Sequence, residues 1–193
     1  MVEKLARKLA GLSFIIWEYI STYSPNLAEV VINNYSEPVI RKEIDVVKIK
    51  KEDKFIQIGC GSMPYTSFII AELTGADVVG IDVDLVAVKN AKKYVQRYKK
   101  NPSTRIRIMF GDGVNHDLSG FDVIMVSLGV EALEEVFENI MKTAKSDARI
   151  IFRNISRYDP RGIVPEDFAI KKILRHPFFW ESVILSKRLN RDA

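Results

Sequence analysis

One short stretch of the sequence, residues 55–84, constrains the fold more than any other. It consists of an apolar run over 55–58, a turn with Gly59 and Gly61, a helix that begins near Pro64, and a second apolar run that ends in Asp82. A strand, a glycine turn, a helix and a strand that ends in an acid form the β-α-β unit of nucleotide-binding proteins. The stretch therefore predicts a parallel sheet with a ligand site at the glycine turn.

The sequence after residue 54 alternates between short apolar runs and helical segments. The runs at 123–126 and 150–152 are apolar throughout, which is typical of strands buried on both faces of a parallel sheet. We expect an α/β fold, a doubly wound Rossmann-like and mostly parallel sheet that ends in an antiparallel hairpin formed by 169–174 and 182–187. The other candidate strands are 55–58, 78–82, 105–110, 122–127 and 149–153, with helices beginning near Pro64, Leu85 and Glu131.

The first fifty residues have a different pattern. Apolar side chains recur at helical spacing over 2–23. Ser24 with Pro25, and Ser36 with Pro38, are signals for the start of two more helices. We therefore expect a short helical N-terminal region over 1–50 and a Rossmann-like domain over 51–193. The N-terminal helices are candidates for the contact in a homodimer.

The composition limits the classes of function. With 193 residues, of which 47% are hydrophobic, the chain can bury a full core. A net charge of +4 without a long basic block does not indicate nucleic-acid binding. The single cysteine, Cys60, and the lack of clustered Cys and His predict no metal site and a reducing, cytoplasmic setting. The apolar run at 12–17 is too short to cross a membrane, so no membrane association is expected.

The glycine turn indicates which ligands fit. Gly59 and Gly61 lie where a strand turns sharply into a helix beside a ligand. Glycine adopts the dihedral angles of such a turn and, because it lacks a Cβ, lets the ligand approach the backbone closely. Pro64 occupies the position where the dinucleotide fingerprint has its third glycine, which counts against NAD or FAD. Between the glycines, we expect Cys60 to be a small buried thiol whose backbone contacts the ligand, and not a nucleophile.

Acidic residues follow the next two candidate strands. Asp82, next to Val83, lies where a carboxylate accepts hydrogen bonds from ribose hydroxyls, and Asp84 is either a second ribose ligand or a helix cap. Asp112 is placed to receive an adenine amino group, the alternative being a plain turn. Since the carboxyl ends of parallel strands meet at one edge of the sheet, we expect these residues to share one site with Gly111, Gly113, Ser127 and Leu128.

The three motifs together resemble those of the class I S-adenosylmethionine-dependent methyltransferases. The matching segments are 58–61, 80–82 and 111–113, and the resemblance covers about residues 54–187. In that family the first motif cradles the methionine part of the cofactor, the second holds the ribose and the third holds the adenine. The resemblance implies S-adenosyl-L-methionine as the cofactor. Gln57 replaces the aspartate or glutamate that usually opens the first motif.

The segment around the glycine turn also resembles a narrower family, the nicotianamine synthases and their archaeal relatives. Residues 59–71 follow a glycine-x-glycine-x-x-proline-x-threonine-serine pattern, in which Pro64, Thr66 and Ser67 match. Those enzymes transfer the 3-amino-3-carboxypropyl group of S-adenosylmethionine to an amine and leave methylthioadenosine. The resemblance implies this reaction on a small amino-acid-like acceptor. Partial agreement extends to 136–140, 148–153 and 182–185.

Three residues are candidates for catalysis. Arg153 matches an arginine of the nicotianamine synthase segment and is expected to anchor a substrate carboxylate, the alternative being a surface arginine. Tyr35 and Glu37 lie in a loop between predicted helices and are candidates for gating or for accepting a proton. Their alternatives are packing for Tyr35 and helix capping for Glu37.

Other functions remain open. A small-molecule methyltransferase would use the same cofactor and the same motifs. A non-catalytic nucleotide-binding module is a second alternative, because the N-terminal region is shorter than that of the nicotianamine synthases. NAD-dependent oxidoreduction is disfavoured by Pro64 and by the glycine-aspartate-glycine turn at 111–113.

Overall fold

The computed structural model describes residues 36–99, 101–177 and 179–188. The helix expected over 2–23, the helix expected after Pro25, the proposed dimer contact and Tyr35 all lie outside these residues. No helix among the described residues is long and apolar enough to span a membrane.

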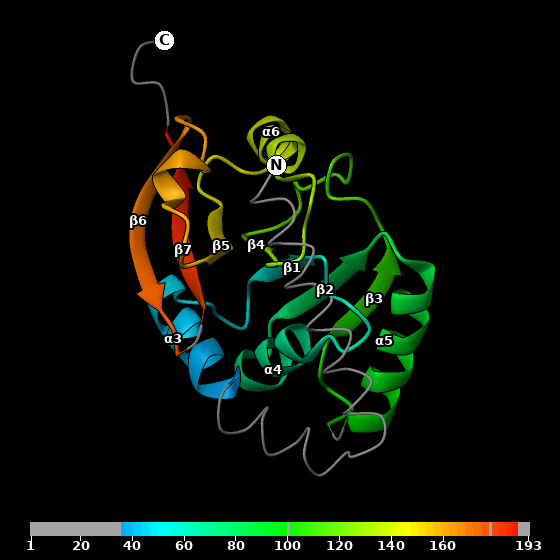
Figure 1. Cartoon of the computed structure of the whole chain (residues 1–193). Coiled ribbons are helices and arrows are strands. Elements are labelled where there is room, and N and C mark those ends of the chain that lie inside the picture. The colour runs from blue at the N-terminus through cyan, green and yellow to red at the C-terminus, as the bar shows by residue number, and fades with distance from the viewer. Residues whose placement is uncertain (1–35, 100, 178, 189–193) are drawn as a thin grey trace.

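The described residues form one seven-stranded sheet in the order β3-β2-β1-β4-β5-β7-β6 (Figure 1). The first five strands are parallel, and β7 lies antiparallel between β5 and β6. This confirms the predicted doubly wound, mostly parallel sheet with a closing hairpin. The strands are β1 (Lys54–Ile58), β2 (Asp77–Asp82), β3 (Ile106–Phe110), β4 (Val123–Val126), β5 (Arg149–Ile155), β6 (Phe168–Arg175) and β7 (Trp180–Lys187).

Helices cover both faces of the sheet. Figure 1 shows α6 (Leu133–Thr143) on one side, with α3 (Glu37–Val47) and α4 (Tyr65–Thr74) on the other. Successive residues of β1 belong to different cores, because strand side chains alternate: Phe55 packs with the α3 and α4 cluster, and Ile56 with the α6 cluster. A fourth helix, α5 (Leu85–Tyr98), packs against β2 and β3.

The third predicted N-terminal helix exists as α3 and packs on the sheet. Ile40 and Val47 of α3 are buried in the same cluster as Phe55 and Val78. Ser36 precedes α3 but makes no side-chain capping hydrogen bond, so the expected cap is wrong although the start of the helix is right. The division between two regions near residue 50 stays a prediction, since α3 shares its core with the strands.

Candidate active site

A cavity of about 670 Å³ opens at the carboxyl ends of the parallel strands. Its lining comes from the segments that follow β1, β2, β3 and β4, together with Arg153 of β5 and Trp180 of β7. Cavities of roughly 300–1,000 Å³ at this position of an open α/β sheet hold small-molecule ligands. The topology therefore brings all three predicted motifs to one site.

The glycine turn after β1 forms one wall of this cavity. Gly59 and Gly61 have φ values of +76° and +65°, which favour glycine. A Cβ on Gly59 would lie 2.9 Å from Cγ2 of Val130, whereas a Cβ on Gly61 would meet nothing within 4 Å. Gly61 therefore presents open backbone to the cavity. Pro64 does not line the cavity and stands instead just before α4.

Cys60 lines the cavity but is chemically quiet. Cys60 is buried. Burial is the larger cause, and the nearby charge of Asp82 the smaller one, of a rise in the pKa of its thiol to about 12. The side chain packs with Val88, Ala91 and Ile108. A thiol with so high a pKa stays protonated at neutral pH, which agrees with the expected structural role.

Asp82 connects the end of β2 to the glycine turn. Its Oδ2 accepts a hydrogen bond from the Gly61 N–H at 2.8 Å, and its Oδ1 accepts one from the Asp84 N–H at 3.0 Å. Each carboxylate oxygen has a further lone pair, so Asp82 can still accept hydroxyl hydrogens from a ligand. Val83 also lines the cavity and is 62% exposed.

Asp84 is a helix cap, which is one of its two predicted roles. Its Oδ1 accepts a hydrogen bond from the Val86 N–H at 2.7 Å, which caps α5. Asp84 is not among the residues that line the cavity. The structure therefore places this carboxylate at the helix start and gives no support to a ribose contact.

The turn after β3 also lines the cavity. Asp112 uses Oδ1 to accept a hydrogen bond from the Val114 N–H at 3.0 Å. A Cβ on Gly113 would lie 2.5 Å from Cγ2 of Ile58, so this position has no room for a side chain. Asn139 of α6 donates to the Gly113 carbonyl at 2.8 Å and holds the turn in place. An adenine contact by Asp112 stays a prediction.

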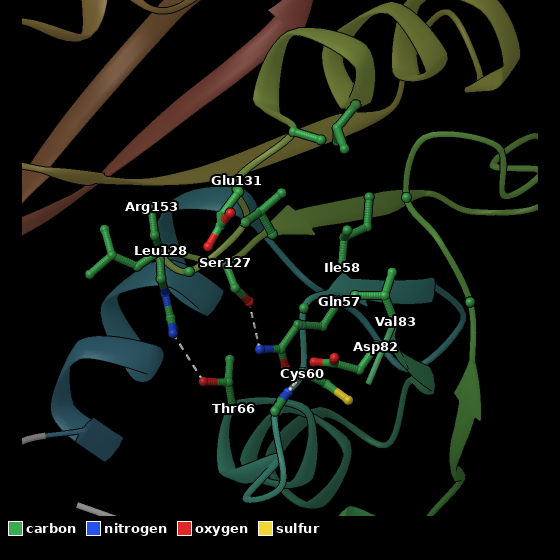
Figure 2. A pocket seen from close by; sticks show the side chains of 18 of the residues that line it. Gln57, Ile58, Cys60, Thr66, Asp82, Val83, Ser127, Leu128, Glu131 and Arg153 are labelled. Atoms are coloured by element: carbon green, nitrogen blue, oxygen red, sulfur yellow. Dashed lines mark hydrogen bonds between the residues drawn. The ribbon is translucent and has the colours of Figure 1, made fainter. Parts of the chain in front are cut away.

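Gln57 ties three elements of the site together. Its Nε2 donates to Oγ of Ser127 at 2.9 Å, and its Oε1 accepts hydrogen bonds from the Ser67 hydroxyl and N–H at 2.6 and 3.1 Å. The residue thus links β1, the start of α4 and the end of β4. Figure 2 shows its hydrogen bond to Ser127. Gln57, Ser127 and Leu128 all line the cavity.

Arg153 lines the far end of the cavity with its charge already paired. Its guanidinium donates from Nε and Nη2 to the two carboxylate oxygens of Glu43 at 3.1 and 2.8 Å. Nη1 donates to Oγ1 of Thr66 at 3.1 Å, and the Trp180 ring centroid lies 5.0 Å from Cζ. Burial lowers the pKa of Arg153, but Glu43 outweighs it and the pKa is raised. Arg153 therefore stays charged, and its ion pair with Glu43 is neutral overall.

The buried pair is part of a longer network that the sequence did not reveal. Glu43 is fully buried and accepts a further hydrogen bond from the Ser182 hydroxyl, whose oxygen lies 2.8 Å from Nε2 of His176. Glu43 and Arg153 are 110 residues apart, so spacing gave no signal of their contact. The lining also includes Tyr65, Glu131 and Trp180, which were not predicted as site residues.

Glu37 lies outside this network. It forms an ion pair with Arg41 at 2.6 Å, one turn along α3, and it does not line the cavity. The structure therefore gives no support to gating or proton acceptance by Glu37. Nor does Glu37 cap α3, because it is the first residue of the helix.

Comparisons with known proteins match this picture of the fold. A family model described as a methyltransferase domain matches residues 56–150. No curated protein sequence matches the chain.

Solved structures extend the match to most of the chain. A glutamate-to-glutamine mutant of MtNAS in complex with S-adenosylmethionine aligns with a TM-score of 0.69 at 18% identity, over 98% of this chain and 73% of that chain. MtNAS in complex with MTA and tNA aligns with a TM-score of 0.64 at 18% identity, over 90% of this chain and 65% of that one. The chain thus spans about two thirds to three quarters of the length of the MtNAS chains.

Methyltransferase structures align as well. An RNA methyltransferase from Salinibacter ruber in complex with S-adenosyl-L-homocysteine gives a TM-score of 0.63 at 16% identity, over 80% of this chain and 95% of that chain. An S-adenosylmethionine-dependent methyltransferase from Aquifex aeolicus gives a TM-score of 0.65 at 14% identity, over 82% of this chain and 93% of that chain. Two of these structures hold S-adenosylmethionine or S-adenosyl-L-homocysteine, which are ligands of the class that the motifs imply. The chain has the class I S-adenosylmethionine-dependent methyltransferase fold.

Proposed function

We propose that this chain is a transferase that moves the 3-amino-3-carboxypropyl group of S-adenosylmethionine to the amine of a small acceptor, as nicotianamine synthases do. The observation that carries the proposal is the contact between Thr66 and Arg153. Both match residues of the nicotianamine synthase segments, they are 87 residues apart, and they are hydrogen-bonded at 3.1 Å on the cavity wall.

The described residues fit the cofactor. The open backbone at Gly61 leaves space beside the glycine turn for the methionine part, and Asp82 has free lone pairs for ribose hydroxyls. Asp112 and the backbone at Gly113 would face the adenine. When bound, S-adenosylmethionine supplies a sulfonium with three electrophilic carbons.

The reaction depends on which of these carbons meets the acceptor. Aminocarboxypropyl transfer and methyl transfer share the electrophilic sulfonium, so placement of the acceptor at about 3 Å from one carbon decides the product. The acceptor amine must be neutral to attack. Leu128, Arg153 and Trp180 bound the far end of the cavity, where the acceptor would enter.

Methyl transfer is the second candidate. It is favoured by the methyltransferase domain model over residues 56–150 and by the similar Salinibacter ruber and Aquifex aeolicus structures. The MtNAS complexes support the first candidate, because MTA, methylthioadenosine, is what aminocarboxypropyl transfer leaves. A non-catalytic module that only binds the cofactor is the third possibility.

The leaving group distinguishes the three. The chain is incubated with S-adenosylmethionine and a panel of amines and amino acids, and the products are identified by mass spectrometry. Methylthioadenosine together with an aminocarboxypropylated acceptor is the expected result. S-adenosylhomocysteine with a methylated acceptor would replace the proposal by methyl transfer, and binding without turnover would favour the module. The Asp82→Ala variant serves as the background control, because it removes the expected ribose ligand.

A further inference from the structure

The charges around the cavity are distributed unevenly. Among the described residues that line it, the charged side chains are Asp82, Asp112, Glu131 and Arg153. Asp82 ends β2 and Asp112 follows β3, at the end assigned to the nucleoside, and both accept backbone hydrogen bonds. Arg153, the one basic residue of this lining, is paired with Glu43. Among the residues that the structure describes, the far end therefore has no unpaired positive charge to bind an acceptor carboxylate.

Glu131 gives this end a negative charge. It follows β4, in the segment that leads into α6, and Figure 2 shows its carboxylate turned into the cavity between Arg153 and Ser127. Within the described part of the chain, no hydrogen bond or ion pair engages this carboxylate. Since the Arg153–Glu43 pair is neutral overall, Glu131 is the uncompensated charge at the acceptor end among the described lining residues.

A carboxylate in this position selects an acceptor by charge. It attracts an ammonium group and repels the carboxylates of an amino acid. It also raises the pKa of a nearby amine, so the ammonium that it binds keeps its proton and cannot attack the cofactor. An acceptor bound in this way needs a second amine to act as the nucleophile.

We propose that Glu131 binds one ammonium group of an aliphatic diamine and positions its other, neutral amine as the acceptor. This rests on the proposed aminocarboxypropyl transfer. The neutral nitrogen forms a bond to the carbon next to the sulfonium, the carbon–sulfur bond breaks with its electron pair left on sulfur, and the new ammonium releases a proton to solvent. Leu128 and Val130, which also line the cavity, provide apolar surface for the methylene chain. Glu131 is a positioning residue in this scheme.

The test compares acceptors and a matched pair of variants. The full chain is assayed with S-adenosylmethionine and 1,4-diaminobutane, butylamine or glutamate, with products followed by mass spectrometry. The diamine should be preferred over each of the other two by at least tenfold in kcat/KM. Glu131→Gln should raise KM for 1,4-diaminobutane at least tenfold while leaving the Kd for S-adenosylmethionine unchanged. Glu134→Gln on the exposed side of α6 should change neither value, since Glu134 is not part of the lining.

A charge-reversing variant and a binding measurement complete the test. Glu131→Lys should abolish the preference for the diamine and increase turnover with glutamate. The acceptor proposal would be overturned if the unmodified chain preferred glutamate, or if Glu131→Gln left the KM for 1,4-diaminobutane unchanged. The proposed aminocarboxypropyl transfer would still stand in either case if methylthioadenosine were released. S-adenosylhomocysteine released with a methylated diamine would reject the proposed function and retain the acceptor. If no acceptor turns over, failure of the cofactor-loaded chain to bind 1,4-diaminobutane in calorimetry rejects the acceptor.

Discussion

At the proposed nucleoside end of the cavity the lining comes from turns at the ends of neighbouring strands, whereas at the proposed acceptor end it includes side chains from segments far apart in the sequence. Gly61, Asp82 and Asp112 lie within about fifty residues and are held by backbone hydrogen bonds. Glu43 and Arg153 come from α3 and β5, 110 residues apart, and are held by each other. The first end depends on local turn geometry, and the second depends on tertiary packing. Pairs of matched substitutions test this difference.

The largest effect is expected at the acceptor end. Glu43→Ala should lower the free energy of unfolding by about 3–5 kcal/mol, because it leaves the buried Arg153 charge without a partner. Glu37→Ala on the same helix should cost at most about 1 kcal/mol, because its pair with Arg41 is exposed to solvent. Urea denaturation measures both. Equal losses of unfolding free energy in the two variants would show that the buried Glu43–Arg153 pair does not stabilise the fold more than an exposed pair does.

The next effect concerns cofactor affinity at the nucleoside end. Asp82→Ala should weaken S-adenosylmethionine binding by roughly 100-fold, about 2–3 kcal/mol, because charge-assisted hydrogen bonds to the ribose are lost. Asp84→Ala should leave the affinity unchanged and cost about 1 kcal/mol of stability through the lost cap on α5. Calorimetric titration separates the two. Unchanged affinity in Asp82→Ala would mean that the nucleoside lies elsewhere.

A smaller effect tests the packing of the turn after β3. Gly113→Ala should destabilise the fold by about 1–3 kcal/mol, because the new Cβ would lie 2.5 Å from Cγ2 of Ile58. Gly120→Ala, with nothing within 4 Å of its added Cβ, should change stability by less than about 0.5 kcal/mol. Thermal unfolding of both variants gives the comparison. Similar Tm values would show that this turn relaxes freely.

The last effect concerns the pH dependence of stability and is absent at neutral pH. Burial lowers the pKa of His176 from 6.5 to about 4. The Glu43 carboxylate opposes this shift, and the positive charges of Arg153 and Lys42 add to it. Between pH 6.5 and pH 4 the unfolded chain binds a proton at this site and the native chain does not, so stability falls as the pH falls through this window. His176→Gln should lack this part of the pH dependence. A wild-type profile identical to that of His176→Gln would contradict the assignment.

The sequence predicted the sheet and the nucleoside end well because both depend on local patterns. Apolar runs such as 123–126 and the glycine turn at Gly59 and Gly61 carry their own signals, and the strands lie within two residues of the expected bounds. Asp84 shows the limit of this approach. Its spacing permits either a ribose contact or a cap, and only the structure shows which one it forms.

The acceptor end could not be predicted because its contacts join elements that are far apart in the sequence. Arg153 has an isolated position in a strand, and nothing near it indicates that its partner is Glu43 of α3. Glu131 marked the start of a helix in the sequence, and its direction into the cavity follows from the path of the chain after β4. Tertiary contacts therefore decide which charges an acceptor meets.

A crystal structure of the chain with S-adenosylmethionine tests the division of the cavity into two ends most directly. The account predicts that the ribose hydroxyls lie within hydrogen-bond distance of Asp82, and that the sulfonium faces the end bounded by Leu128, Glu131 and Arg153. A cofactor with its ribose away from Asp82, or with its sulfonium turned toward Asp112, would contradict it.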